Sequence, residues 1–297
     1  MTLSYYSTMR SKVWRPIVGL TILAITVGVF VDYFVTHKSV RQQLAHTSPE
    51  VLIIILALYI GTIGALMLIA ASTLRLCNIR LSLGDNLLLN AYTTVINFFG
   101  PLQSGPAFRA LYLKRKYHLN LKRYAVATLM YYFFFAVFSG AFLLSGLLKW
   151  WLVPLIAAGL LVSFALSRTP SISRRLQEID MTAWYYLAAA TLLQVSLVAA
   201  IYFTELHSLS HHVSVSQAII YTGAANFALF VSLTPGAIGF RESFLVFSER
   251  LHHISGSLIV AANILDRAMY LVLLLLLMVF LLLTHARRQL SVPEKQA

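Results

Sequence analysis

Six long apolar runs constrain this chain more than any other feature, because each is long enough to cross a bilayer as a helix. They occupy residues 16–36, 51–74, 124–145, 150–167, 183–205 and 258–284. About 20 apolar residues in helical conformation cover the roughly 30 Å of hydrocarbon in a bilayer. With 59% hydrophobic and only 11% charged residues, the sequence predicts an all-α integral membrane protein with about six transmembrane helices. We expect one polytopic membrane domain over residues 1–297.

The distribution of charge excludes several classes of protein. The net charge is +13, but the lysines and arginines cluster beside the apolar runs, where they favour anionic lipid and set topology. This pattern argues against a nucleic-acid partner. The loops are too short for a soluble catalytic domain and hold no nucleophile or metal motif, so we expect no enzyme activity, no catalytic residue and no cofactor. A weak alternative is a metal site at the loop histidines His207, His211 and His212, which lack carboxylate neighbours.

Two further apolar runs, 86–100 and 218–234, are better explained as re-entrant hairpins than as crossings. The basic cluster 109–123 follows the first run, and Arg75 and Arg80 precede it. The positive-inside rule therefore puts both ends of the first run in the cytoplasm. The second run has few basic residues on either side, which places both of its ends on the outer face. With this topology, both termini are cytoplasmic.

The two hairpins share a spacing that indicates an internal repeat. The same spacing joins two sets of residues, Ser82, Pro101 and Gly105 in the first set and Ser216, Pro235 and Gly239, 134 positions later, in the second. A span, a hairpin and a span over residues 51–145 would then match the same elements over residues 183–284, entered from the opposite face of the membrane. Inverted-topology repeats of this kind place a binding site near the bilayer midplane.

The breaks in these hairpins supply groups that bind anions. Proline and glycine interrupt the helix and leave backbone N–H groups at membrane depth, and a helix N-terminus attracts negative charge. The candidate substrate-binding residues are Pro101, Gly105 and Arg109 in the first hairpin, and Pro235, Gly236, Gly239, Arg241 and Glu242 in the second. The arginines suit phosphate or carboxylate. Two simpler explanations remain open: Arg241 pairs with Glu242 or Glu249, and Arg109 only follows the positive-inside bias.

The last span carries a polar stripe on one helical face, at positions i, i+3, i+4 and i+7. The stripe consists of Asn263, Asp266, Arg267 and Tyr270. Ionised groups in hydrocarbon cost about 2.5–3.5 kcal/mol each, so these side chains must face the protein interior. In a functional role, the stripe provides a cation that lines a path for a lipid headgroup, or Asp266 titrates and couples transport to protons. In a structural role, Asp266 pairs with Arg267 or Arg241 and only fixes helix packing.

Three motifs resemble those of a known family. They are two broken segments that contain an arginine, PLQSGPAFR and TPGAIGFRE, and the segment ILDRAMY in the last span. In these motifs the chain resembles the flippase-like membrane region of lysylphosphatidylglycerol synthase and its stand-alone relatives in bacteria and archaea. That family usually has a second glycine and an acidic residue where this chain has Pro106, Ala107 and Phe108. It often has a charged residue in the following span, where this chain has Tyr131 and Tyr132.

The resemblance implies movement of a polar or aminoacylated phospholipid between the leaflets of the bacterial cytoplasmic (inner) membrane, with the two hairpins handling the headgroup. The resemblance covers the membrane region and not the aminoacyl-transfer domain of the bifunctional members, so we expect no lipid synthesis. The leading hypothesis is translocation or binding of a phospholipid or lipid-linked molecule that bears an anionic group. The alternative is a non-transporting accessory or scaffold protein for envelope lipid or glycan synthesis. A homo-oligomer, or a complex with an envelope-synthesis partner, is compatible with both.

Overall fold

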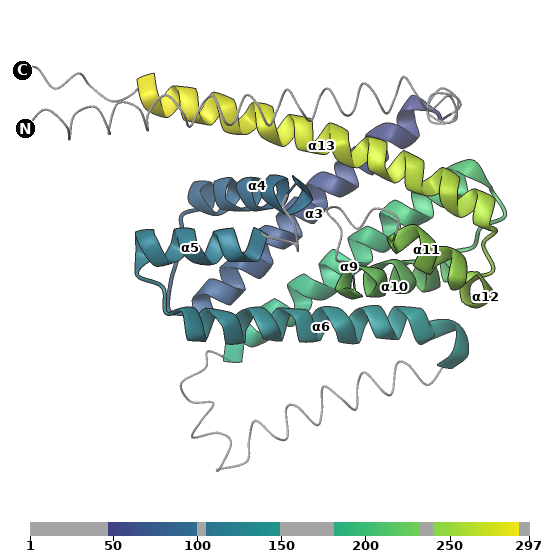
Figure 1. Cartoon of the computed structure of the whole chain (residues 1–297), viewed down its shortest axis with the longest axis horizontal. Coiled ribbons are helices and arrows are strands. Elements are labelled where there is room, and N and C mark those ends of the chain that lie inside the picture. Colours follow the sequence, from purple (N-terminus) through teal and green to yellow (C-terminus); the bar gives the residue numbers. More distant parts are fainter. Residues whose placement is uncertain (1–46, 100–104, 149–180, 232–239, 291–297) are drawn as a thin grey trace, which may run out of the picture. The chain divides into compact units, whose positions relative to one another are not determined.

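The computed structural model describes residues 47–99, 105–148, 181–231 and 240–290, and these are almost entirely helical (Figure 1). The helices are α3 (Pro49–Leu76), α4 (Leu83–Phe99), α5 (Gly105–Tyr117), α6 (Leu121–Leu148), α9 (Met181–Leu209), α10 (Val215–Val231), α11 (Phe240–Phe247), α12 (Glu249–His252) and α13 (Gly256–Leu290). All of them belong to one compact unit, Ser48–Ala297. Since the described residues contain no strand, the predicted all-α fold is confirmed.

Four of these helices are long and apolar enough to cross a membrane. The candidate spans are Pro49–Leu76, Leu121–Gly146, Thr182–Leu209 and Gly256–Thr284. They coincide with four of the six predicted spans. The other two predicted spans, 16–36 and 150–167, lie outside the described residues.

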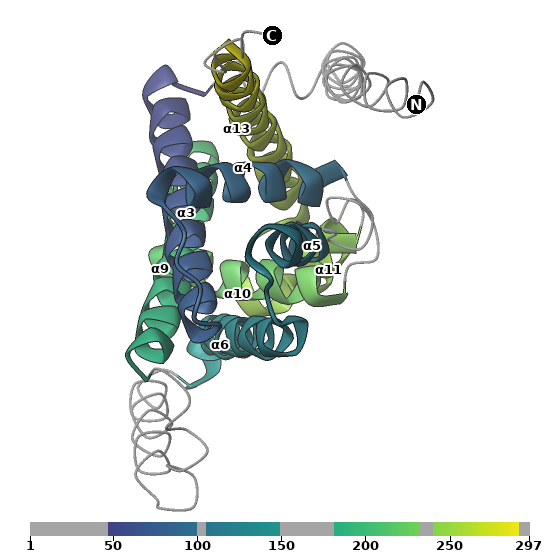
Figure 2. The same ribbon diagram turned by 90° about the vertical axis from the view of Figure 1, so that its left-hand side faces the viewer.

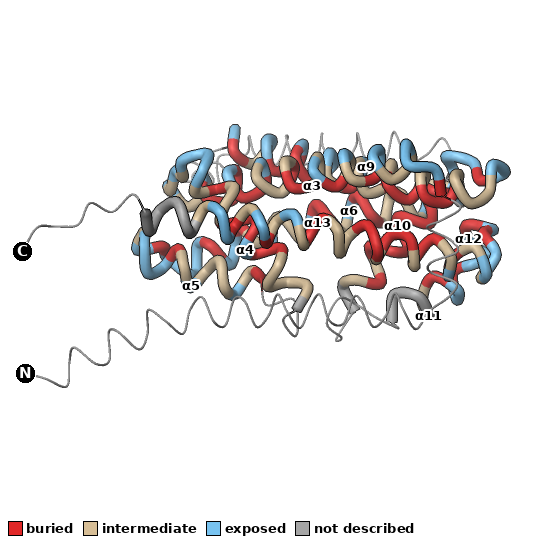
Figure 3. The backbone as a smooth tube through the Cα atoms, turned by 90° about the horizontal axis from the view of Figure 1, so that it is seen from above, coloured by how far each residue is buried: buried red, intermediate tan, exposed pale blue. Residues whose placement is uncertain are grey.

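Large apolar side chains are exposed on the outer faces of these spans. Ile53 is 67% exposed, Phe133 62% and Leu283 60%. Figure 3 shows exposed residues along the outer edge of α3 and α9, and buried residues where helices face one another. An apolar outer surface of this kind is expected for helices that are surrounded by lipid instead of water.

Serine side chains set the starts of two corresponding helices. Ser82 Oγ accepts a hydrogen bond from the Asp85 N–H at 3.1 Å, at the start of α4. Ser214 Oγ accepts from the Gln217 N–H at 3.3 Å, and the Gln217 side chain accepts from the Ser214 N–H at 3.0 Å, at the start of α10. This reciprocal arrangement is a capping box. The serine that caps α10 is thus Ser214, two residues before the predicted match Ser216.

The helices after residue 181 repeat the order of those before residue 148. Both parts contain a long helix, a 17-residue helix, a segment outside the described residues and a second long helix; before the second long helix, the first part has one short helix, α5, and the second part has two, α11 and α12. In Figure 1, α3 and α9 pack against each other in opposite directions, and α6 and α13 also run in opposite directions. The packing is reciprocal, because α6 contacts α10 and α13 contacts α4. The predicted repeat halves, 51–145 and 183–284, require this order and these directions.

The helices on either side of each break pack against each other, α4 with α5 and α10 with α11. Each pair is a helical hairpin whose turn, at 100–104 or 232–239, lies outside the described residues. Both hairpins lie on the same side of the α3–α9 pair (Figure 2). Their re-entrant position in a bilayer stays a prediction.

The second hairpin is held against the first half of the chain by a close approach of two backbones. A Cβ atom at Gly223 of α10 would lie 2.6 Å from Leu143 Cα and 2.7 Å from the Ser139 carbonyl oxygen, both on α6. Asn226 Nδ2 of α10 donates to Ser139 Oγ at 3.1 Å. Small residues permit this kind of contact between membrane helices. The α6–α10 interface thus depends on a glycine and a buried hydrogen bond.

Candidate functional site

The first hairpin closes through direct contact between Gly105 and α4. The Gly105 N–H donates to Asn97 Oδ1 at 3.4 Å. A Cβ atom at Gly105 would lie 2.9 Å from the Thr93 carbonyl oxygen and 3.1 Å from Asn97 Cβ. The position requires glycine because the first turn of α5 rests on the backbone of α4. The other predicted residue of this break, Pro101, lies outside the described residues.

Arg109 lies about one turn into α5 and reaches α4 and α6. Its Nη2 donates to Asn90 Oδ1 at 2.8 Å, and Asn90 is fully buried. Nε of the same guanidinium is buried and has no hydrogen-bond partner among the described residues. Tyr124, Tyr131 and Tyr132 of α6 lie within electrostatic range of the guanidinium. The structure therefore places this predicted arginine half-buried, with its Nε buried, beside neutral polar groups.

Five polar side chains on α4 form a stripe that sequence reasoning missed. They are Asn86, Asn90, Thr93, Thr94 and Asn97. Asn86 Nδ2 donates to the Met67 carbonyl oxygen of α3 at 2.9 Å, and Asn90 Nδ2 donates to Asn86 Oδ1 at 2.7 Å. Hydrogen bonds therefore connect α3, α4 and Arg109 of α5. The available signal was the spacing of three or four positions between polar residues, within a run that is apolar as a whole.

The second hairpin is described only in part. Pro235, Gly236 and Gly239 lie outside the described residues. Arg241 and Glu242 fall in the first turn of α11, and their side chains are outside the description as well. The predicted anion site of this hairpin, and its alternative, a pair between Arg241 and Glu242 or Glu249, therefore stay predictions.

Two residues of the predicted α13 stripe contact α3. The Tyr59 hydroxyl of α3 donates to Asp266 Oδ1, and the Asp266 side chain is buried. The Tyr270 ring centroid lies 5.5 Å from that of Tyr59 and 5.6 Å from that of Phe98 on α4. Asp266 therefore sits beside a contact of three aromatic rings from three helices.

The remaining stripe residues also lie on the inner side of α13. Asn263 is buried, and its Nδ2 donates to the Ile259 carbonyl oxygen of the same helix at 2.9 Å. Arg267 is half-buried. Of the stripe, Asn263 and Asp266 thus face the interior of the protein, whereas Arg267 and Tyr270 are only half-buried.

Helix α4 connects the two groups of predicted residues. Its Asn90 binds Arg109, and its Phe98 contacts Tyr270. The eight positions from Asn90 to Phe98 correspond to about 12 Å along a helix axis. The arginine of the first hairpin and the α13 stripe therefore both approach α4, about two turns apart.

Glu205 on α9 is a functional candidate that sequence reasoning missed. Its side chain is fully buried and lies within electrostatic range of Tyr59, as Asp266 does. Two buried carboxylates, from α9 and α13, thus lie near one tyrosine of α3. The available signal was the position of Glu205, an acidic residue at the end of the apolar run 183–205. From the sequence, Glu205 was interpreted only as the end of a span.

Tyr59→Phe is expected to destabilise the folded protein by about 1–3 kcal/mol, because the buried Asp266 loses a hydrogen-bond donor. Thermal unfolding in detergent of Tyr59→Phe, Asp266→Ala and the double variant measures the coupling between the two residues. Tyr186→Phe is the matched control, since Tyr186 is 61% exposed on α9. Additive losses in the double variant would contradict a coupled pair.

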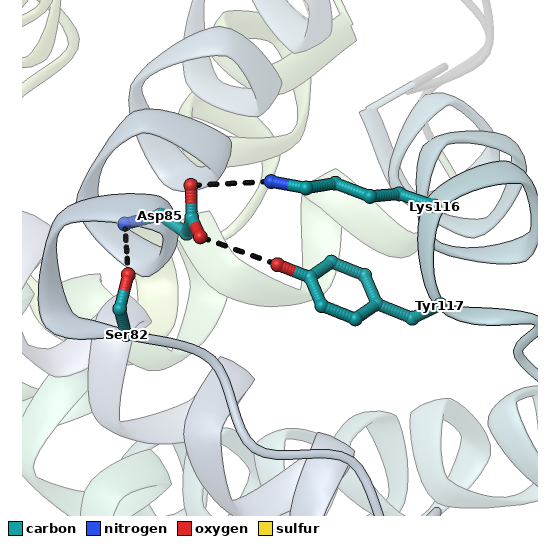
Figure 4. A network of polar contacts seen from close by, with 4 residues as sticks. All are labelled: Ser82, Asp85, Lys116 and Tyr117. Atoms are coloured by element: carbon teal, nitrogen blue, oxygen red, sulfur yellow. Dashed lines mark hydrogen bonds and ion pairs between the residues drawn. The ribbon is translucent and has the colours of Figure 1, made fainter.

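A polar network joins α4 and α5 at the base of the first hairpin (Figure 4). Lys116 Nζ lies 3.3 Å from Asp85 Oδ1, and the Tyr117 hydroxyl donates to Asp85 Oδ2 at 3.2 Å. The Lys116 side chain is 42% exposed and that of Asp85 23%, so water screens this pair. Asp85 thus links the start of α4 to the end of α5.

The loop histidines lie near one another at the C-terminal end of α9. The ring centroids of His207 and His211 are 5.1 Å apart, and the His207 ring stacks on Phe203. In the part of the chain that the structure describes, no three histidine, cysteine or acidic side chains are grouped to hold a metal.

A comparison with protein families matches most of the chain. The family model described as "Lysylphosphatidylglycerol synthase TM region" matches residues 17–277. The matched region contains Arg109, Glu205 and Asp266 and therefore the whole candidate site. No curated protein and no solved structure matches the chain.

Proposed function

Because the chain belongs to the family of the lysylphosphatidylglycerol synthase TM region, we propose that it binds a phospholipid or lipid-linked molecule by an anionic group and moves it between leaflets. The membrane concerned is the bacterial cytoplasmic membrane. In this proposal Arg109 binds the anionic group, and Asp266 and Tyr270 line the path of the headgroup. The lipid is carried without covalent change, so the proposal includes no enzyme activity.

The guanidinium of Arg109 is the observation that carries this proposal. Asn90 holds Nη2 at 2.8 Å, whereas the buried Nε has no hydrogen-bond partner in the described ranges. A buried donor without an acceptor costs about 1–3 kcal/mol, and more when it is charged. A phosphate oxygen would satisfy Nε with a charge-assisted hydrogen bond, in a geometry to which the arginine fork is suited.

The arrangement of the halves supports transport between leaflets. We propose that residues 51–145 and 183–284 form an inverted-topology repeat, and that the two hairpins enter the membrane from opposite faces. The support is the repeated helix order, the opposite directions of α3 and α9, and the reciprocal packing of α6 on α10 and of α13 on α4. In such repeats the hairpin ends meet near the midplane. The basic cluster 109–123 then puts the base of the first hairpin and both termini in the cytoplasm.

Arg109→Ala is expected to reduce lipid transfer about 10- to 100-fold, because it removes charge-assisted hydrogen bonds worth roughly 1.5–3 kcal/mol. The assay places the purified protein in liposomes that contain phosphatidylglycerol with a fluorescent acyl chain. The rate at which the inner-leaflet label becomes accessible to an external quencher measures transfer. Arg115→Ala is the matched control, since Arg115 is exposed on the same helix. Arg109→Lys should retain part of the activity because it keeps the charge but loses the fork.

Equal transfer by the wild type and by a folded Arg109→Ala protein would overturn the proposal. The accessory or scaffold hypothesis would be favoured by two findings together. The folded wild-type protein would transfer no lipid, and it would co-purify in fixed ratio with a synthase of envelope lipid or glycan. The same purification would show whether the chain associates with itself.

A further inference from the structure

The geometry points to Asn90 as a positioning residue that orients Arg109 for a phosphate and leaves the positive charge of the guanidinium un-neutralised. The inference rests on the proposed function, in which Arg109 binds the anionic group of the lipid. It adds a chemical requirement to that site: the side chain that holds the guanidinium must be a hydrogen-bond acceptor without a charge of its own.

The orientation of the Asn90 amide is fixed by its own helix. Both hydrogens of the amide group are used, since Nδ2 donates to the Asn86 carbonyl oxygen at 2.9 Å and to Asn86 Oδ1 at 2.7 Å. The Asn90 side chain is fully buried. The amide therefore presents only its oxygen to α5, and this oxygen accepts from Arg109 Nη2 at 2.8 Å.

Asn86 is oriented in turn by the neighbouring helix α3. Its Nδ2 donates to the Met67 carbonyl oxygen at 2.9 Å. A carbonyl oxygen can only accept, so this contact fixes which end of the Asn86 amide faces α3 and leaves Oδ1 for Asn90. Hydrogen bonds thus run from the backbone of α3 through two asparagines to the guanidinium, and each has a defined donor and acceptor.

Helix α4 binds Lys116 and Arg109 of α5 in different ways. At the base of the hairpin, a carboxylate oxygen of Asp85 lies 3.3 Å from Lys116 Nζ (Figure 4). Farther into the hairpin, an amide oxygen holds Arg109. Among the residues that the structure describes, no ion pair includes Arg109. The same helix therefore offers a carboxylate to the exposed lysine and an uncharged acceptor to the half-buried arginine.

An amide at position 90 has an advantage over a carboxylate for binding an anion. A carboxylate would form a charge-assisted, bidentate pair with the guanidinium and cancel its charge, so an anionic ligand would have to displace it. The amide oxygen occupies only Nη2, and the buried Nε has no hydrogen-bond partner in the described ranges. Charges interact more strongly away from water. Asn90 thus fixes the position of Arg109 while its charge stays available to a phosphate.

Two substitutions at position 90 test this inference, since they separate the acceptor from the charge. Asn90→Ala removes the acceptor, whereas Asn90→Asp keeps an acceptor for Nη2 and adds a negative charge. Transfer of phosphatidylglycerol with a fluorescent acyl chain, in liposomes, should slow about two- to fivefold in Asn90→Ala. It should slow about 10- to 100-fold in Asn90→Asp, as in Arg109→Ala. A residue with only a structural role would give the opposite order, because Asn90→Asp retains a hydrogen bond to Arg109.

The matched control is Asn120→Asp, which makes the same chemical change at an exposed position. Asn120 Oδ1 accepts from the Lys122 N–H at 3.0 Å and from the Arg123 N–H at 3.3 Å, at the start of α6. A carboxylate caps a helix about as well as an amide. We expect Asn120→Asp to transfer lipid within about twofold of the wild-type rate. Thermal unfolding in detergent establishes that each variant is folded.

The outcomes separate this inference from the proposed function. If folded Asn90→Asp transfers lipid as fast as Asn90→Ala or faster, while Arg109→Ala stays slow, the inference is overturned and the proposed function is intact. Failure of the wild type to transfer lipid would overturn both. If Asn90→Asp does not fold, Asn90→Ala is compared in the wild-type and Arg109→Ala backgrounds. A positioning residue slows transfer only in the first background, and equal slowing in both would overturn the inference.

Discussion

Gly223→Ala is expected to lower the free energy of unfolding by about 3 kcal/mol or more, which is at the upper end of the cost of overpacking. The new methyl group would collide with the backbone of α6 at Leu143 Cα and at the Ser139 carbonyl oxygen. Backbone atoms cannot rotate away, so α10 must withdraw from α6. The withdrawal also breaks the buried hydrogen bond from Asn226 to Ser139.

Thermal unfolding in detergent, followed by size-exclusion elution, measures this effect. The matched control is Gly64→Ala in the interior of α3, where an added Cβ atom meets nothing within 4 Å. The control should stay within about 1 kcal/mol of the wild type, because alanine favours helix over glycine. Equal stability of the two variants would show that α6 and α10 do not approach as closely as described.

Gly105→Ala is expected to reduce lipid transfer by about 100-fold, through displacement of the first turn of α5. The added methyl group would lie 2.9 Å from the Thr93 carbonyl oxygen, so the hairpin has to open. Arg109 lies on the same short helix and would move with it, away from Asn90. A displacement of about 1 Å in a group that positions a ligand typically costs on the order of 100-fold in rate.

The control for this variant is Gly84→Ala, at the start of α4 in the same hairpin, where an added Cβ atom again meets nothing within 4 Å. We expect Gly84→Ala to transfer lipid at about the wild-type rate. If Gly105→Ala also keeps that rate while remaining folded, the close contact between the two arms of the hairpin has no role in transfer.

The positions of the spans could be predicted because bilayer thickness fixes the length of an apolar run. The predicted run 51–74 corresponds to α3, Pro49–Leu76, and the predicted run 183–205 corresponds to α9, Met181–Leu209. The ends differ by a few residues because polar caps and amphipathic turns extend a helix beyond the hydrocarbon. Proline together with glycine likewise marked the two segments, 100–104 and 232–239, that separate the described helices α4 from α5 and α10 from α11, because proline removes a backbone donor and glycine permits non-helical backbone.

The partners of the polar residues could not be predicted in the same way. Tyr59 and Asp266 are 207 positions apart in the chain, and nothing local to either residue identifies the other. Glu205 and the α4 stripe are polar groups in apolar runs, which indicates that they face inward but not which helix they meet. Gly223 gave no signal at all, because a helical glycine is informative only once the neighbouring backbone is known.

The packing of α10 on α6 has a consequence for how the protein is made. The surface of α6 around Ser139 and Leu143 leaves the ribosome before α10, which begins only at Val215. At about 5–20 residues per second, roughly 3 to 15 seconds separate the two events. During that interval α6 must be sheltered by lipid or by the insertion machinery. If the halves were made separately, α6 would lack α10 and α13 would lack α4. The packing of this chain in the membrane is therefore completed only when its last third has been translated.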